Sequence, residues 1–131
     1  MAVRFLSQEW AEAVTRALNS SEEFTGAAAR HNTTVQQVVT GTPAGEKKYY
    51  FAIADGVARL GIGEISGADA TITQTYDTAV AISKRELHPQ QAFMQGKLRV
   101  HGNLMQLLQL QPVLSALGHA VSTLDVEYEP I

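Results

Sequence analysis

Histidines and carboxylates are the side chains in this chain that could carry out acid–base or metal chemistry. The four histidines, His31, His88, His101 and His119, are never four residues apart, and no His-Glu-x-x-His sequence occurs. No Gly-x-Ser-x-Gly nucleophile elbow is present, and the acidic residues are scattered over expected helix surfaces. The absence of cysteine excludes thiolate catalysis and sulfur-ligated metals. The sequence therefore predicts no enzyme, no metal and no cofactor.

Two glycine-containing segments resemble nucleotide-binding loops in composition only. The segment from Gly41 to Lys47 lacks the Gly-Lys-Ser/Thr that closes a phosphate-binding loop. Gly61, Gly63 and Gly67 are spaced one residue too far apart for a dinucleotide fingerprint, and a strand rather than a helix is expected after them. Glycines that relieve crowding in a curved or bulged strand are the simpler interpretation.

Length, charge and composition are those of one globular domain over residues 1–131. A chain of this length buries roughly two thirds of its unfolded surface, which is enough for one core. The net charge of −3 gives no sign of a nucleic-acid partner. No leader sequence, no apolar run near the roughly 18 residues of a membrane span and no peroxisomal C-terminal tripeptide is visible. We expect a cytoplasmic location.

The clearest structural signal is a hairpin. Asp55-Gly56 separates two apolar runs, and this dipeptide favours a two-residue turn. If Ala54 pairs with Val57, one face of the hairpin carries a set of mostly large apolar side chains. These residues are Tyr49, Phe51, Ile53, Ala58, Leu60 and Ile62. The turn and the hydrophobic pattern predict the same register, so this face is expected to be buried.

Before the hairpin, the pattern predicts two helices and a strand. The first helix runs from Gln8 to about Leu18, with Ser7 as its cap. A capping box at Ser20 and Glu23 starts a short second helix. The strand covers Thr33 to Thr40, but its valines fit no strict period and its register stays open.

After the hairpin, strands and short helices alternate. A strand is expected from Ala68 to Thr75, and a helix capped by Asp77 extends to about Leu87. Pro89 suits the first turn of a further helix. The final helical region is apolar on more than one face, and we expect it to kink or restart at Pro112.

The stretch between these last helices, QAFMQGKLRVHGNLMQLLQLQ, is the most distinctive in the chain. Gly96 suits the end of a helix, and Lys97 to His101 alternates as a short strand. Gly102 breaks this strand, and Asn103 is a good cap for the apolar helix that follows.

This stretch resembles the signature of the sterol carrier protein 2 family, A-F-M-x-G-K-L-x-[IV]-x-G-[DN] followed by an apolar helix. The matching residues are Ala92, Phe93, Met94, Gly96, Lys97, Leu98, Val100 and Gly102. Asn103 stands where the family commonly has an acidic residue, which keeps the cap and loses a charge. The resemblance implies an α+β fold: a five-stranded, mixed, mostly antiparallel sheet with helices packed on one side. It also implies an apolar tunnel closed by the C-terminal helix.

The residues and the resemblance favour non-catalytic binding or transfer of a long apolar ligand: a fatty acid, fatty acyl-CoA, sterol or phospholipid. Leucine and methionine adapt to irregular shapes, and each buried CH₂ contributes about 0.8 kcal/mol, so an alkyl chain needs no polar anchor. The expected cavity lining is Phe51, Ile53, Leu60, Ile72, Val80, Phe93, Met94, Leu98, Val100, Leu104, Met105, Leu107, Leu108, Leu114 and Leu117.

Alternatives remain open at this point. On pattern alone the same side chains are better explained as a filled core, and only the resemblance reverses that order. A homodimerisation or scaffold domain with a filled core, using the apolar C-terminal helix as its interface, is the second hypothesis. An enzyme acting on a lipid-like substrate ranks last. The expected partner is thus a small apolar ligand, with a transient membrane contact and a homodimer left open.

Overall fold

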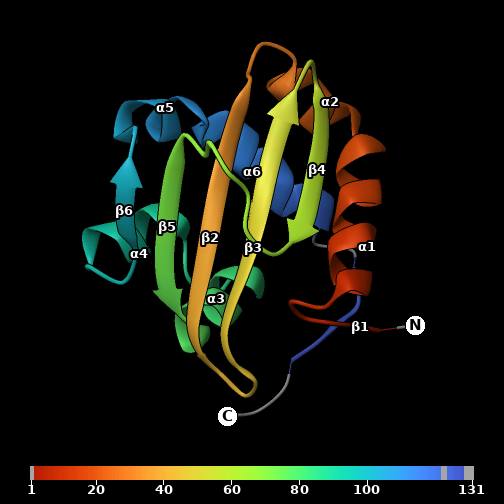
Figure 1. Cartoon of the computed structure of the whole chain (residues 1–131). Coiled ribbons are helices and arrows are strands. Elements are labelled where there is room, and N and C mark those ends of the chain that lie inside the picture. The colour runs from red at the N-terminus through yellow and green to blue at the C-terminus, as the bar shows by residue number, and fades with distance from the viewer. Residues whose placement is uncertain (1, 122–123, 129–131) are drawn as a thin grey trace.

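The computed structural model describes residues 2–121 and 124–128, except for the side chain of Leu114 (Figure 1). Its helices and strands follow one another as β1 (Val3–Arg4), α1 (Gln8–Asn19), α2 (Glu22–Ala28), β2 (Thr33–Thr42), β3 (Gly45–Ala54), β4 (Val57–Ile62), β5 (Ala70–Thr75), α3 (Tyr76–Ser83), α4 (Pro89–Met94), β6 (Arg99–Gly102), α5 (Leu104–Gln109), α6 (Gln111–Val121) and β7 (Val126–Glu127). Figure 1 shows α6 behind the sheet and α1 beside β4.

The main sheet has five strands in the order β4-β3-β2-β5-β6. β3 pairs antiparallel with β2 and β4, β5 pairs antiparallel with β6, and β2 and β5 are parallel. Asp69 fixes the return of the chain to β2, because its N–H donates to the carbonyl of Thr34 and its carboxylate accepts from the N–H of Thr34, both at 2.8 Å. The predicted five-stranded, mixed, mostly antiparallel sheet is confirmed.

The hairpin between β3 and β4 has the predicted register. Ala54 pairs with Val57, and the pairing continues down the hairpin to Tyr49 and Ile62. Asp55 and Gly56 have φ angles of 53° and 78°, as a type I′ turn requires. The turn dipeptide and the hydrophobic pattern therefore correctly predicted which side chains share a face.

Helix starts were predicted with mixed success. Ser7 caps α1 as expected, accepting from the N–H of Trp10 at 3.1 Å. The cap of α2 is Ser21 rather than Ser20. Thr75, not Asp77, caps α3, because its hydroxyl accepts from the N–H of Thr78 at 3.3 Å.

The ends of the later elements also differ from the prediction. α3 ends at Ser83, four residues before the expected end at Leu87. α4 begins at Pro89, as predicted. The last helical region does restart, but the break lies at Leu110, and Pro112 already belongs to the first turn of α6. Proline fits there because the first N–H groups of a helix have no intrahelical partner.

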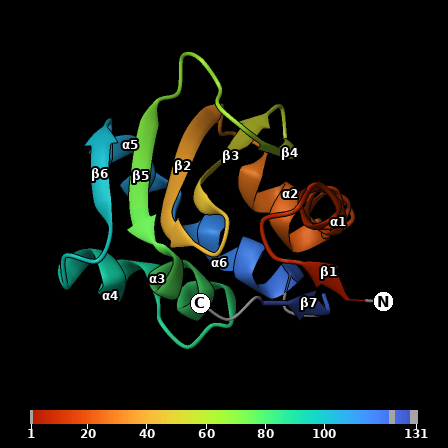
Figure 2. The ribbon, with the colours of Figure 1, turned by 60° about the horizontal axis from the view of Figure 1, so that its bottom comes forward.

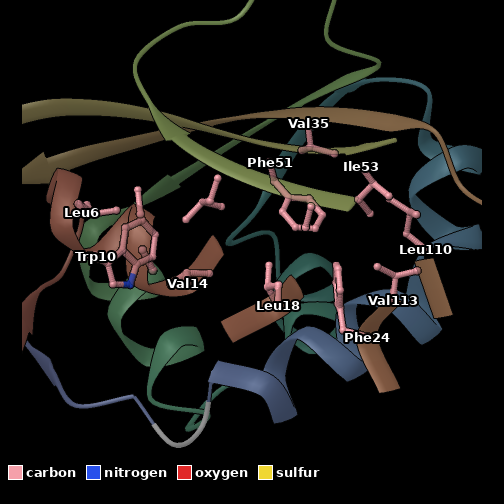
Figure 3. Close-up of a cluster of buried hydrophobic side chains, with 14 of the residues drawn as sticks. Leu6, Trp10, Val14, Leu18, Phe24, Val35, Phe51, Ile53, Leu110 and Val113 are labelled. Atoms are coloured by element: carbon pink, nitrogen blue, oxygen red, sulfur yellow. The ribbon is translucent and has the colours of Figure 1, made fainter. Parts of the chain in front are cut away.

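The core lies between β2–β4 and the helices α1, α2 and α6 (Figure 3). Val35, Phe51 and Ile53 point from the sheet toward the helices in this view. The ring of Phe24 meets that of Phe51 edge-on, with 6.2 Å between centroids. Trp10 is 7% exposed and belongs to this core.

A second, two-stranded sheet joins the two ends of the described chain and was not predicted. β1 and β7 run parallel, with Val3 opposite Val126, and Figure 2 shows them side by side. The ring of Phe5 lies 5.1 Å from the rings of both Trp10 and Tyr128. Two strands of two residues carry too little sequence pattern to be recognised.

The two glycines of the distinctive stretch permit a direct test of this architecture. Gly102 has φ 107°, and a Cβ there would lie 2.5 Å from the carbonyl oxygen of Asp69 and 2.9 Å from Cα of Ala70. Gly102→Ala should lower the free energy of unfolding by about 3 kcal/mol, because the cost of a positive φ for alanine is added to the cost of the clash between its Cβ and the backbone of Asp69 and Ala70.

Gly96→Ala is the matched control, because Gly96 has φ 77° but open space around it. Gly96→Ala should lower the free energy of unfolding by only about 1 kcal/mol, because alanine is strained in a left-handed backbone conformation but meets no neighbouring atom there. Urea unfolding of both variants measures the difference. If both variants lost the same amount of unfolding free energy, β6 would not pack against the Asp69–Ala70 backbone.

Candidate functional site

The face of the sheet that the helices cover, here called the inner face, is well filled at one end. Leu60, Phe51, Val35 and Ala70 lie side by side across β4, β3, β2 and β5. They are 8%, 5%, 4% and 2% exposed. Three of the strands therefore contribute large side chains to a filled core.

The next row of the inner face is only partly covered. This middle row crosses all five strands, from β4 to β6, through paired residues. It consists of Ile62, Tyr49, Gln37, Ile72 and Val100, each of them partly buried. Because neighbouring strands are about 4.8 Å apart, the row spans about 19 Å, the length scale of a long alkyl chain.

Apolar side chains of the short helices are exposed on the same side of the molecule as β5 and β6. Figures 1 and 2 both show β6, α4 and α5 together at this edge, on the opposite side from α1. Phe93 and Met94 of α4 are 40% and 78% exposed. Leu104, Met105 and Leu108 of α5 are 40%, 66% and 49% exposed.

The structure does not bring all of the predicted lining residues together in one region. Phe51, Ile53 and Leu60 lie in the filled core. The other described residues are partly buried or exposed and lie on β5, α3, α4, β6, α5 and α6, with Leu98 in the loop just before β6: Ile72, Val80, Phe93, Met94, Leu98, Val100, Leu104, Met105, Leu107, Leu108 and Leu117. The side chain of Leu114 lies outside the described part.

Two glutamines of the inner face were not predicted. Gln74 Nε2 donates to Gln37 Oε1 at 2.9 Å. Gln74 is 7% exposed, and its Oε1 accepts no hydrogen bond from the part of the chain that the structure describes. Their inward direction follows from the pairing of β2 with β3 and β5, which the irregular pattern of β2 did not reveal.

Tyr49 contributes a second polar group to the middle row. Its ring meets the ring of Trp10 edge-on, with 5.3 Å between centroids. Burial raises the pKa of the Tyr49 phenol well above its ordinary value, because the charged form is poorly solvated. The hydroxyl therefore stays protonated to a higher pH than that of a tyrosine in water.

The opposite, outer face carries a surface pocket of about 340 Å³ with a different character. Lys48 Nζ lies 2.6 Å from Glu64 Oε1, and this contact lowers the pKa of the Glu64 carboxyl and raises that of Lys48. The Gln36 side chain donates to the carbonyls of Tyr49 and Gly63 and accepts from the N–H of Ile65. The polar side chains that line this pocket therefore bond to one another and to the backbone.

Within residues 2–121 and 124–128, no three His, Asp or Glu side chains gather closely enough to hold a metal ion. His119 Nδ1 instead lies 2.9 Å from the carboxylate of Glu23 at an exposed position. No helix in this part of the chain has the length and apolar character to cross a membrane.

Comparison with known proteins decides the family. The model of the SCP-2 sterol transfer family matches residues 12–115, which is most of the chain and includes the middle row. The chain belongs to the SCP-2 sterol transfer family. The resemblance seen around Gly96 and Gly102 thus extends over nearly the whole fold.

Relatives and solved structures agree with this assignment. Mouse stomatin-like protein 1 is 34% identical over 77 residues, covering 57% of this SCP-2 family member and 19% of the mouse protein. Chicken sterol carrier protein 2 is 33% identical over 72 residues, covering 51% and 13%. The chain therefore spans less than a fifth of the length of these curated relatives.

A crystal structure of sterol carrier protein 2 superposes on this SCP-2 family member with a TM-score of 0.79. The two are 22% identical, and the match covers 92% of this chain and 99% of the other. At this identity the likeness shows the shared fold.

The raised pKa of Tyr49 in this SCP-2 family member has a measurable consequence. Below about pH 10 the phenol is protonated in both the folded and the unfolded chain, whereas above it the unfolded chain ionises first and stability falls. Tyr49→Phe should lose less stability than the wild type between about pH 9.5 and 11. Urea midpoints across this range measure the difference, and parallel curves for the two proteins would contradict the burial of this hydroxyl.

Proposed function

We propose that this protein binds and transfers a long apolar lipid on the inner face of its sheet, without catalysing a reaction. The observation that carries the proposal is the middle row, which faces the helical layer and which the described side chains cover only partly. A fatty acid, fatty acyl-CoA, sterol or phospholipid is the class of ligand. The whole chain, residues 1–131, acts as the carrier domain.

The apolar composition of this region supports a lipid rather than a polar ligand. Ile72 and Val100 provide a floor on β5 and β6, and Val80 and Leu107 are partly buried against the same core. Each CH₂ of a ligand removed from water there contributes about 0.8 kcal/mol. An alkyl chain along the row would also cover protein surface that is now partly open to water.

Membership of a family named for sterol transfer, and not for a reaction, also supports a carrier. Transfer requires the ligand to leave one membrane or protein and enter another. The exposed side chains of Phe93, Met94 and Met105 would lie against a bilayer during such a transient contact. A cytoplasmic location remains a prediction from the sequence.

The exposed α5 side chains also fit the second function, a homodimer with a filled core. Leu104 and Leu108 would then pack against a second copy. We expect native mass spectrometry of the purified protein to show a monomer that carries co-purified lipid. An empty, stable dimer would favour the homodimer instead.

The middle row can be tested with two neighbouring residues of β6. Val100 belongs to the inner face beside Ile72, and His101 to the outer face beside Thr71. Val100→Asp should weaken binding of a fluorescent fatty acid by about tenfold or more, because it places a charge against the alkyl chain. His101→Asp puts the same charge on the same edge strand and should leave binding near the wild-type value.

Titration of the fluorescent fatty acid into both variants, after their unfolding midpoints have been compared, makes this measurement. Equal binding by Val100→Asp and His101→Asp would show that the inner face near β6 does not hold the ligand.

A further inference from the structure

The most unusual polar group of the inner face is the carboxamide of Gln74. It lies next to Val39, which is fully buried, and is itself 7% exposed. Its Nε2 donates to Gln37 Oε1 at 2.9 Å, while its Oε1 accepts no hydrogen bond from the described residues. A buried acceptor of this kind is costly to leave unsatisfied, so it calls for a partner from outside the described chain.

Gln37 brings this group into the incompletely covered region. It stands in the middle row between Tyr49 on β3 and Ile72 on β5. The structure gives its Nε2 no acceptor within the part of the chain it describes. The linked pair thus ends in an unused donor on Gln37 and an unused acceptor on Gln74.

The neighbouring Gln36 shows what a glutamine with a purely structural role looks like here. Its Nε2 donates to the carbonyls of Tyr49 and Gly63, at 2.8 and 3.1 Å, and its Oε1 accepts from Ile65 at 2.8 Å. Gln36 therefore links β3 to the segment after β4 on the outer face, and both of its side-chain polar atoms have partners. Gln37 and Gln74 lack such partners, which sets them apart as groups available to a ligand.

We propose that Gln37 and Gln74 form the polar end of the lipid site and select a ligand whose head is a hydroxyl group. A hydroxyl donates to Gln74 Oε1 and accepts from Gln37 Nε2, so it satisfies both unused atoms. A long-chain alcohol and a sterol share this chemistry. The inference rests on the proposed lipid-binding function and adds the head group to it.

Other head groups match the pair less well. An ionised carboxylate and an ether oxygen only accept hydrogen bonds, so the buried Oε1 stays unsatisfied. One cation shares the inner face nearby: Lys47 pairs with Val39, which in turn stands beside Gln74. A fatty acid held by its carboxylate at Lys47 is therefore the competing arrangement.

The test compares three ligands that share one alkyl chain: hexadecan-1-ol, its methyl ether and hexadecanoate. Each displaces a fluorescent fatty acid from the delipidated wild type and from the double variant Gln37→Leu/Gln74→Leu. The wild type should bind the alcohol about tenfold more tightly than the ether, the effect of one or two neutral hydrogen bonds. The double variant should bind the alcohol and the ether equally.

The double variant keeps the volume of the site and removes both partners of the buried pair. Its unfolding midpoint should match or exceed that of the wild type, because no polar group is left unsatisfied. If the double variant is as stable as the wild type but no longer prefers the alcohol to the ether, the loss of preference is due to the missing contacts with the ligand and not to a folding defect.

Two results would overturn the proposal while leaving lipid binding intact. One is equal affinity of the wild type for the alcohol and the ether. The other is tightest binding of hexadecanoate with loss of that preference in Lys47→Ala, which would place the head group at the cation. If none of the three ligands displaces the probe, lipid binding itself fails, and the head-group assignment fails with it.

Discussion

The structure depends on a mismatch between a five-stranded sheet and the helices available to cover its inner face. α1 is tied to β4 by side-chain hydrogen bonds: Asn19 bonds both backbone groups of Ala58, and the Thr15 hydroxyl accepts from the N–H of Leu60 at 3.0 Å. The core between β2–β4 and the helices α1, α2 and α6 is therefore well covered. At the opposite edge, α4 and α5 have only six residues each. A helix of less than two turns presents too narrow an apolar stripe to cover two strands, so β5 and β6 keep partly open side chains.

Turn dipeptides and helix-capping residues correctly predicted the features that depend on a few neighbouring residues. The Asp55-Gly56 turn fixed the β3–β4 register, and Asn103 caps α5 by accepting from the N–H of Gln106 at 3.0 Å. Cap positions failed where two candidates lay close together, as with Ser20 and Ser21. At such sites the choice depends on how the helix enters its packing, which sequence spacing does not contain.

Long-range contacts explain why the site was predicted only in part. Phe51, Ile53 and Tyr49 alternate along one strand and were predicted to share a face, yet the first two are buried in the core and Tyr49, although packed on Trp10, is only partly buried. How completely the helices cover each side chain depends on the placement of α1 and α2, and no periodicity in β3 encodes that. The direction of Gln37 was hidden for a related reason, since β2 is paired on both sides and its burial pattern does not alternate strictly.

The contrast between Gln36 and Gln37 suggests how one strand serves both stability and binding. The two neighbours point to opposite faces, as successive residues of a strand must. Gln36 has all its hydrogen bonds supplied by backbone, so it contributes to a rigid outer face without a ligand. The Gln37–Gln74 pair is one bond short at Gln74, which destabilises the empty protein by about 1–3 kcal/mol. A ligand that completes the pair recovers that free energy only when bound, so the same defect that weakens the empty site sharpens its discrimination among lipids that differ solely in their head groups.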